Sequence, residues 1–172
     1  PHTGAMPRTR ATTTNTTAQP DHQVVCIAYP GAMSLDITGP MQVFATANDV
    51  RQRQGLSAHY QLVFAGLEAG PVRLSCGLQI LASHGLRQLR LQAASTVLVP
   101  GGDGIESAQH NEALRQWVQR AEKRVQRIGS VCSGALVLAR AGLLDGLPAT
   151  THWCRLNDLA ALQRDIRIDG DR

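Results

Sequence analysis

Short apolar runs that alternate with segments of helical periodicity constrain the fold of this chain most strongly. The runs occupy residues 24–29, 60–66, 95–102 and 127–131. Continuous apolar runs of this length are typical of strands that are buried on both faces of a sheet. Strands that alternate with helices favour a parallel sheet with helices on both faces. The sequence therefore predicts a doubly wound, mostly parallel α/β fold of the flavodoxin type.

The segments between these runs predict where the helices lie. Helices are expected at residues 39–52, 111–124, 133–141 and 152–164. The first would hold Pro40 in its opening turn with Thr38 as a cap, because proline fits the first turn of a helix. The stretches "VRLS" and "LQILAS", on either side of Cys76, predict a hairpin or an edge excursion. A short final strand is expected at residues 165–169.

Composition bounds the domain organisation. A chain of 172 residues suits one domain, and 43% hydrophobic residues with only 3% aromatic ones imply an aliphatic core. Residues 1–22 are rich in threonine and lack periodicity, so a disordered tail is expected there. The ordered domain is expected to run from Gln23 to Arg172.

Charge, hydropathy and cysteine spacing argue against several classes of function. The net charge is +4, but no run of five basic residues occurs, so direct nucleic-acid binding by this segment is not indicated. No apolar run approaches the roughly 18 residues of a transmembrane helix, so no membrane partner is expected. The four cysteines form no CxxC pair, so neither a metal nor a cofactor is expected. The strand-like context of Cys26 and Cys132 indicates free thiols and a cytoplasmic protein.

Cys132 lies between a predicted strand and a predicted helix, in the stretch "SVCSG". Small residues two positions before and after it permit the sharp turn of a nucleophile elbow. A thiol at the start of a helix is favoured as the thiolate, so the sequence predicts a reactive sulfur with a lowered pKa. The alternative is a small buried side chain at a crowded packing point. Cys76 and Cys154 are given no role.

Three further features fall at the same predicted sheet edge. The pair Gly101-Gly102 offers backbone N–H groups to an oxyanion or a ligand carboxylate, or makes an ordinary turn. Asp36 is a candidate acid or base beside the thiol, or a helix cap. His152 is a candidate neighbour of the sulfur, or a histidine packed against Trp153.

Taken in order, "LDITGP", "LVPGG", "VCSGALVLARAGLLDG" and "ATTHW" resemble the ThiJ/PfpI superfamily. The resemblance implies the class I glutamine amidotransferase-like fold, and it is nearest to the N-terminal domain of GlxA-like AraC-type regulators. Isonitrile hydratases share nearly the same motifs. By this resemblance Cys132 matches the elbow cysteine and Asp36 the carboxylate beside it. Ser133, Gly101, Gly102 and His152 match residues that line the pocket.

The resemblance implies two main functions. The first is the sensing domain of an AraC-type regulator: a homodimer that binds a small metabolite, with DNA contacted only through a C-terminal helix-turn-helix domain. The second is a cysteine-dependent isonitrile hydratase, in which Cys132 attacks the isonitrile carbon and Asp36 shuttles the proton to give an N-substituted formamide. A redox-reactive stress protein is a third, less favoured reading, because such relatives carry glutamate where this chain has Asp36.

The resemblance also predicts that the domain is cut short. Members of the superfamily continue beyond "RID" with a further strand, a "SAG"-type turn and a closing helix, whereas this chain stops at Arg172. One face of the sheet is therefore expected to be bare or covered by another chain.

Overall fold

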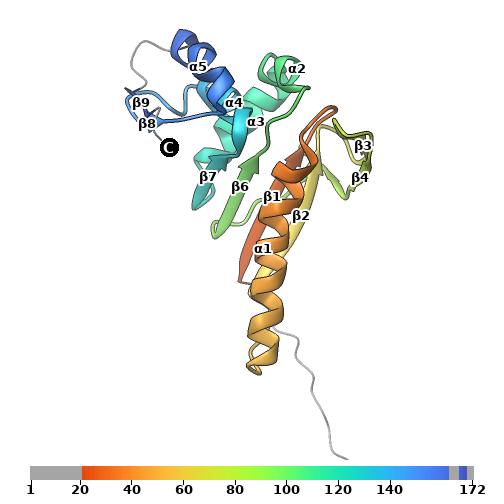
Figure 1. The fold of residues 1–172 in the computed structure, drawn as a ribbon. Helices are drawn as coiled ribbons and strands as arrows, with labels where there is room; N and C mark the ends of the chain where they lie inside the picture. Colours follow the sequence, from red (N-terminus) through yellow and green to blue (C-terminus); the bar gives the residue numbers. More distant parts are fainter. Residues whose placement is uncertain (1–20, 163–166, 170–172) are drawn as a thin grey trace, which may run out of the picture.

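A five-stranded parallel sheet forms the centre of the molecule in the computed structural model, which describes residues 21–162 and 167–169. Its strands follow the spatial order β5-β2-β1-β6-β7, and Figure 1 shows β2, β1, β6 and β7 side by side in that order. They are β1 (His22–Ala28), β2 (Tyr60–Gly66), β5 (His84–Gly85), β6 (Ser95–Val99) and β7 (Arg127–Ser130). Every pairing among them is parallel. The predicted α/β fold with a mostly parallel sheet is confirmed.

Two helical crossovers run in opposite directions from the middle of this sheet. Helix α1 (Ser34–Arg53) joins β1 to β2, and α3 (Glu112–Glu122) lies between β6 and β7 on the other side of the sheet order. Parallel crossovers are almost always right-handed, so opposite directions place the two helices on opposite faces. Figure 1 shows α1 lying along β1 and β2.

The core is aliphatic, as its composition predicts. All seven residues of β1 are buried, which is what a central strand covered on both faces requires. Helix α3 turns an apolar stripe inward and charged side chains outward. Its buried residues recur at the spacing of one helix face: Leu114, Trp117, Val118 and Ala121.

The remaining elements are short. Strands β3 (Gly70–Arg73) and β4 (Gln79–Ala82) pair antiparallel, so the predicted hairpin is confirmed. Helix α2 (Ile105–Gln109) follows β6. After β7 come, in order, η1 (Cys132–Gly134), α4 (Ala135–Arg140), β8 (Pro148–Ala149), η2 (Trp153–Arg155), α5 (Leu156–Leu162) and β9 (Arg167–Ile168).

The start of the fold differs from the prediction at one residue. Order is predicted from Gln23, whereas β1 begins at His22. His22 is buried, and its Nε2 lies 2.8 Å from Thr96 Oγ1. Its backbone N–H donates to the His59 carbonyl, which extends the pairing with the neighbouring chain segment to this residue. The rest of the predicted tail, residues 1–20, lies outside the described residues.

Helix α1 begins five residues earlier than predicted, at Ser34 rather than Gly39. Pro40 consequently lies inside the helix, where it costs one backbone hydrogen bond but keeps a helical φ. Thr38 is not a cap: its hydroxyl donates to the Ser34 carbonyl one turn earlier, at 2.9 Å. The earlier start buries Asp36 and Ile37 at the carboxyl end of the sheet.

The C-terminal helices and strand also differ in detail. The helices predicted at 133–141 and 152–164 each begin with a 3₁₀ turn, η1 and η2, before α4 and α5. Residues 163 and 164 lie outside the described residues. The final strand, β9, pairs with β8 in a separate two-stranded sheet rather than with the central one. Within the described ranges no helix is both long and apolar enough to cross a bilayer.

Asn48 joins the last third of α1 to the start of β2. Its side chain donates to the Tyr60 carbonyl at 2.8 Å and accepts the backbone N–H groups of His59 and Tyr60, each at 2.9 Å. Replacing Asn48 by alanine leaves these half-buried backbone groups without partners. We expect Asn48→Ala to lower the free energy of unfolding by about 2–3 kcal/mol, measured by urea denaturation. Gln52→Ala, on the exposed end of the same helix, should change it by less than about 0.5 kcal/mol; equal losses would contradict the role of Asn48.

Candidate functional site

The candidate site lies where β1, β6 and β7 end at one edge of the sheet. The chain leaves β1 toward β2 and leaves β6 toward β7, so the crossovers diverge between β1 and β6. Such a switch point leaves a crevice outside the carboxyl ends of the strands. The segments that follow these three strands carry Asp36, Gly101, Gly102, Cys132 and Ser133, whereas His152 comes from the segment between β8 and η2.

Cys132 occupies a strained turn directly after β7. Its φ of 54° is the one positive value among non-glycine residues in the described part of the chain. Side chains at such angles cost roughly 1–3 kcal/mol and are held by their surroundings. Gly134 permits the turn, because a Cβ there would overlap the carbonyl of Val99 at the end of β6. Strand, sharp turn and helix therefore follow one another as the nucleophile-elbow prediction requires.

The loop after β6 is fastened to both neighbouring loops through its glycines. The Gly101 N–H donates to Asp36 Oδ2 at 3.0 Å, and the Gly102 N–H donates to Ser133 Oγ at 3.2 Å. The Met33 N–H donates back to the Gly101 carbonyl at 2.8 Å. A Cβ on Gly101 would overlap Ser133. These N–H groups are therefore bound to the protein's own acceptors and are not free for an oxyanion.

Asp36 accepts one of these hydrogen bonds and is not a helix cap. The residue at the N-cap of α1 is Met33, which makes no side-chain cap hydrogen bond. The Asp36 carboxylate is buried in the first turn of α1 and lies close enough to the Cys132 thiol to hydrogen-bond with it. Asp36 and Cys132 are thus brought together, as the resemblance implies.

The environment of Cys132 holds its thiol in the neutral form. Burial is the largest cause and raises the pKa of Cys132, and the charge and hydrogen bond of Asp36 raise it further. Hydrogen bonds from the backbone and side chain of Ser133 lower the pKa but do not outweigh burial. The prediction of a lowered pKa is therefore wrong: the desolvation of a half-buried sulfur beside a carboxylate exceeds the favourable effect of the helix start.

Two further ionisable groups lie beneath the elbow. Tyr29 is buried and donates its hydroxyl to the Pro100 carbonyl at 2.6 Å. Burial, followed by the charge of Asp36, raises the pKa of Tyr29. The same two causes raise the pKa of Cys26 to about 12. The floor of the site is therefore apolar and disfavours additional negative charge.

His152 lies beside Cys132, but its hydrogen-bonded partner is Cys154. The distance from His152 Nδ1 to Cys154 Sγ is 3.0 Å, and the Cys154 N–H donates to the same nitrogen at 3.4 Å. His152 thereby caps η2. The His152 ring also lies against the ring of Trp153, with the centroids 5.5 Å apart, although Trp153 itself is 78% exposed.

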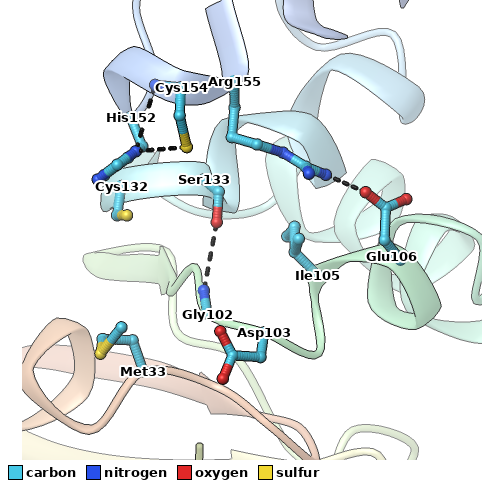
Figure 2. Close-up of a pocket in the computed structure, with 10 residues that line it drawn as sticks. All are labelled: Met33, Gly102, Asp103, Ile105, Glu106, Cys132, Ser133, His152, Cys154 and Arg155. Atoms are coloured by element: carbon cyan, nitrogen blue, oxygen red, sulfur yellow. Dashed lines mark hydrogen bonds and ion pairs between the residues drawn. The ribbon is translucent and has the colours of Figure 1, made fainter.

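These groups border a cavity of about 370 Å³. Figure 2 shows Cys132, His152 and Cys154 together on one side and the Arg155–Glu106 ion pair on the other. The hydrogen bond from Arg155 lowers the pKa of Glu106, which is therefore ionised at neutral pH. The full lining is Met33, Gly102, Asp103, Ile105, Glu106, Cys132, Ser133, His152, Cys154 and Arg155. Asp36 and Gly101 lie behind this wall.

Sequence reasoning missed the charged end of the cavity and Cys154. Glu106 follows the glycine loop by one helical turn, and this nearness to a predicted site loop is a signal that could have found it. Arg155 and Cys154 follow "ATTHW" directly, but no pattern there indicates which side chains face inward. Among the described residues no group of three or more His, Cys, Asp or Glu side chains is placed to hold a metal ion.

Comparison with known proteins gives a consistent family and several kinds of relative. Residues 22–166 match the DJ-1/PfpI family. An uncharacterised protein of Streptomyces lividans is 37% identical over 81% of this chain and 93% of its own length. The isonitrile hydratase of Pseudomonas putida is 33% identical over 76% of this chain. The HTH-type regulator GbdR of Pseudomonas aeruginosa is 33% identical over 77%.

These last two relatives are much longer than the matched region. The chain covers 52% of the isonitrile hydratase and 35% of GbdR. Among solved structures, a ThiJ/PfpI family protein from Pseudomonas syringae superposes with a TM-score of 0.72 at 28% identity, over 94% of this chain and 62% of that one. The sequence-based recognition of the superfamily is confirmed.

The protonation of Cys132 can be followed by its reaction with iodoacetamide. Because burial and Asp36 raise its pKa, the pH midpoint of its alkylation should exceed that of a cysteine in a peptide. Asp36→Asn removes the negative charge while keeping an oxygen for the Gly101 N–H, so it should shift the midpoint to lower pH. Asp103→Asn removes another carboxylate of the cavity and should leave it in place. A midpoint below that of the peptide, or one indifferent to Asp36→Asn, would contradict this account; peptide mass spectrometry measures the rates.

Proposed function

The chain belongs to the DJ-1/PfpI family, and from that premise we propose that it forms the ligand-sensing domain of an AraC-type transcriptional regulator. The observation that carries the proposal is a cavity built around an elbow thiol that stays protonated at neutral pH. A nucleophile needs its thiolate, whereas a binding pocket does not. The similarity to the HTH-type regulator GbdR supports the same assignment.

The charges of the cavity support a small amino-acid-like or other nitrogenous metabolite as its ligand. Arg155 offers a guanidinium, Glu106 and Asp103 offer carboxylates, and all three line the cavity. A ligand that carries one positive and one negative charge can pair with Glu106 and Arg155 in place of their bond to each other, so no charge is left unpaired. The volume of about 370 Å³ lies at the small end of ligand sites. Ligand binding would then bias the regulator between two states, with DNA bound by a helix-turn-helix region elsewhere.

The outer face of α1 supports a homodimer as the assembly of this domain. Leu35 is 70% exposed and Val43 66% exposed, and they lie four residues on either side of Gly39. Between Ser34 and Asn48 the one charged residue is Asp36, which is buried, so the outward face carries no charge. By contrast, α3 presents charged side chains such as Glu112 and Arg115 to solvent. An uncharged apolar helix face is typical of one that is covered.

Gly39 points to a second copy of α1 as the cover. A glycine inside a helix costs about 1 kcal/mol relative to alanine. Nothing in the described part of the chain requires this glycine, because a Cβ there would meet only the tip of Leu35, at 3.9 Å. Two antiparallel copies crossing at Gly39 would set Leu35 of each against Val43 of the other, as a two-fold interface demands. Asp36 and Met33 lie at the start of the same helix, so a displacement in the cavity would also displace the interface.

A second candidate function is the hydration of isonitriles. It is favoured by the hydrogen bond between Asp36 and the Cys132 thiol, and by the similarity to the isonitrile hydratase of Pseudomonas putida. In this case Asp36 would take the thiol proton as sulfur attacks the isonitrile carbon and would return it to that carbon, giving a thioimidate. Water would then add to the same carbon, and the C–S bond would break to release the formamide and the Cys132 thiol. The buried carboxylate would have to accept that proton, which the apolar floor of the site assists.

Ligand binding is tested by thermal shift and calorimetry with the twenty amino acids and their decarboxylated amines. We expect at least one to raise the melting temperature, and Met33→Trp, which fills the cavity, to abolish the effect. Leu78→Trp, at a 64% exposed position outside the cavity, should leave it intact. No shift with any probe would count against sensing of this class. If a simple alkyl isonitrile is instead converted to its formamide, and Cys132→Ala stops the conversion, the hydratase function replaces the sensor.

The dimer is tested by sedimentation equilibrium. The wild-type chain should sediment at twice its 18.5 kDa mass. Val43→Glu should weaken association by at least about 100-fold, because it buries two unpaired carboxylates in one interface, each against Leu35 of the other copy. Leu81→Glu, at a 71% exposed position on the β3–β4 hairpin, should remain dimeric. A monomeric wild type, or a Val43→Glu variant that associates normally, would refute the α1 interface.

A further inference from the structure

Cys154 is distinguished from the other cysteines by an imidazole within hydrogen-bonding distance. Because a backbone N–H always donates, the bond from the Cys154 N–H makes His152 Nδ1 an acceptor. The Cys154 thiol, 3.0 Å from the same nitrogen, must therefore donate its proton to it. A base in this position is what removes a proton from an attacking thiol. The thiol is exposed, so a small reagent can reach it.

The other cysteines lack this combination. Cys26 is fully buried in β1. Cys76 is exposed in the turn between β3 and β4, and hydrogen bonds with Ser34 and with the backbone of Leu78 lower its pKa. These groups take the place of an imidazole at its sulfur, and Cys76 does not line the cavity. Cys132 is half-buried, with a raised pKa. Among the four cysteines, Cys154 is therefore the exposed thiol that has both a base within hydrogen-bonding distance and a place in the cavity wall.

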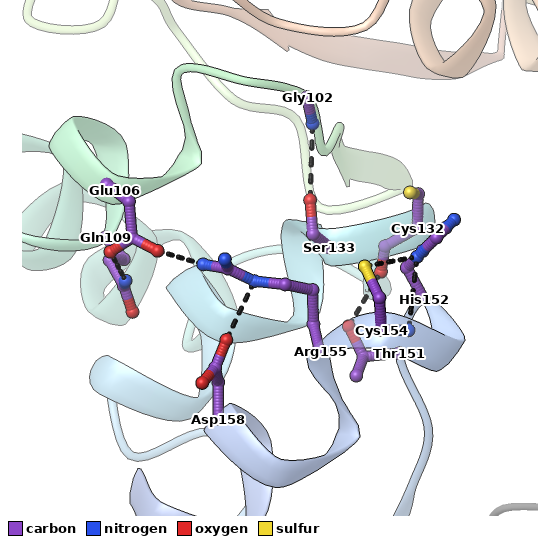
Figure 3. A network of polar contacts seen from close by, with 10 residues as sticks. All are labelled: Gly102, Glu106, Gln109, Cys132, Ser133, Thr151, His152, Cys154, Arg155 and Asp158. Carbon is purple, nitrogen blue, oxygen red and sulfur yellow. Dashed lines mark hydrogen bonds and ion pairs between the residues drawn. The ribbon is translucent and has the colours of Figure 1, made fainter.

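A second thiol borders the same cavity. Both Cys132 and Cys154 line it, and Figure 3 shows the ring of His152 beside both sulfurs. The hydroxyl of Thr151 donates to the Cys132 carbonyl at 3.1 Å, which ties the segment before η2 to the elbow. Cys154 therefore has a base, and Cys132 is a protonated thiol beside it on a fixed turn.

We propose that Cys154 and Cys132 form a dithiol site that is oxidised to an intramolecular disulfide by peroxides. His152 takes the proton of Cys154, and the sulfur attacks a peroxide oxygen. The O–O bond breaks, the hydroxide formed from hydrogen peroxide takes the proton back from His152, and Cys154 becomes a sulfenic acid with release of water. Cys132 then attacks that sulfur, its proton joins the leaving hydroxide, and a disulfide and a second water result.

The disulfide would change the cavity directly. It would join η2 to the elbow across one side of the wall and remove the thiol of Cys132 from the lining. A ligand that fits the reduced cavity would then lose affinity on oxidation. This consequence rests on the proposed sensing function, whereas disulfide formation itself does not.

Peptide mass spectrometry after limited oxidation tests the site. The chain is treated with one equivalent of hydrogen peroxide, blocked with N-ethylmaleimide and digested with trypsin. We expect the peptide of residues 128–140 joined to that of residues 141–155, lost again after dithiothreitol. His152→Asn should slow the joining by at least about tenfold, since it removes the base. Cys76→Ser, which changes an exposed cysteine outside the cavity, should form the joined peptide at the wild-type rate.

The variants separate this site from oxidation of the elbow alone. In Cys154→Ser, Cys132 should keep its free thiol over the time in which the wild type is fully joined; far-ultraviolet circular dichroism confirms that each variant is folded. The proposal is overturned if the wild type gives no joined peptide, or if Cys132 in Cys154→Ser oxidises as fast as in the wild type. Preferential oxidation of Cys76 would overturn it as well. Absence of ligand binding in the thermal-shift experiment leaves these outcomes unaffected.

Discussion

The close approach of the Gly101 backbone to the elbow is the constraint on which the site depends. Asp36 accepts the Gly101 N–H, Ser133 accepts the Gly102 N–H, and a Cβ on Gly101 would overlap Ser133. Loops that follow three different strands are thereby held together at one edge of the sheet. That contact helps to maintain the strained backbone of Cys132, together with the hydrogen bond from Thr151 to its carbonyl, because a positive φ persists only where its surroundings impose it.

The same packing sets the chemistry of the sulfur. Bringing Asp36 under the elbow buries a carboxylate next to Cys132 and disfavours the thiolate, although the thiol lies at the start of a helical segment. The glycine N–H groups that could stabilise an anion are already bonded to Asp36 and Ser133. The outcome is a neutral, partly apolar end of a cavity whose opposite end carries the Arg155–Glu106 pair. Such an asymmetric cavity suits recognition of a small charged molecule better than attack on it.

The thiol that we propose to react with oxidants, Cys154, lies at the edge of the same cavity. Cys154 has the exposure and the base that Cys132 lacks, and the two thiols face one space. A domain with this arrangement would respond both to a ligand and to oxidants, and in the proposed dimer the uncharged face of α1 would carry either signal to the partner copy. The segment between Met33 and Asp36 links three parts of the site. Met33 lines the cavity, Asp36 is the buried carboxylate, and helix α1 begins between them at Ser34.

The sequence by itself determined the sheet, the crossovers and the elbow, because these depend on local apolar runs and on small residues around Cys132. The hairpin, the stripe of α3 and the pairing of Asp36 with the elbow cysteine could likewise be predicted from sequence and family resemblance. Only the tertiary structure decided the protonation of Cys132, since burial is a property of neighbours distant in the chain. It also decided the partner of His152 and the position of Arg155 against Glu106, 49 residues apart. Side-chain direction in short 3₁₀ turns follows from packing, and no periodicity in "THWCR" encodes it.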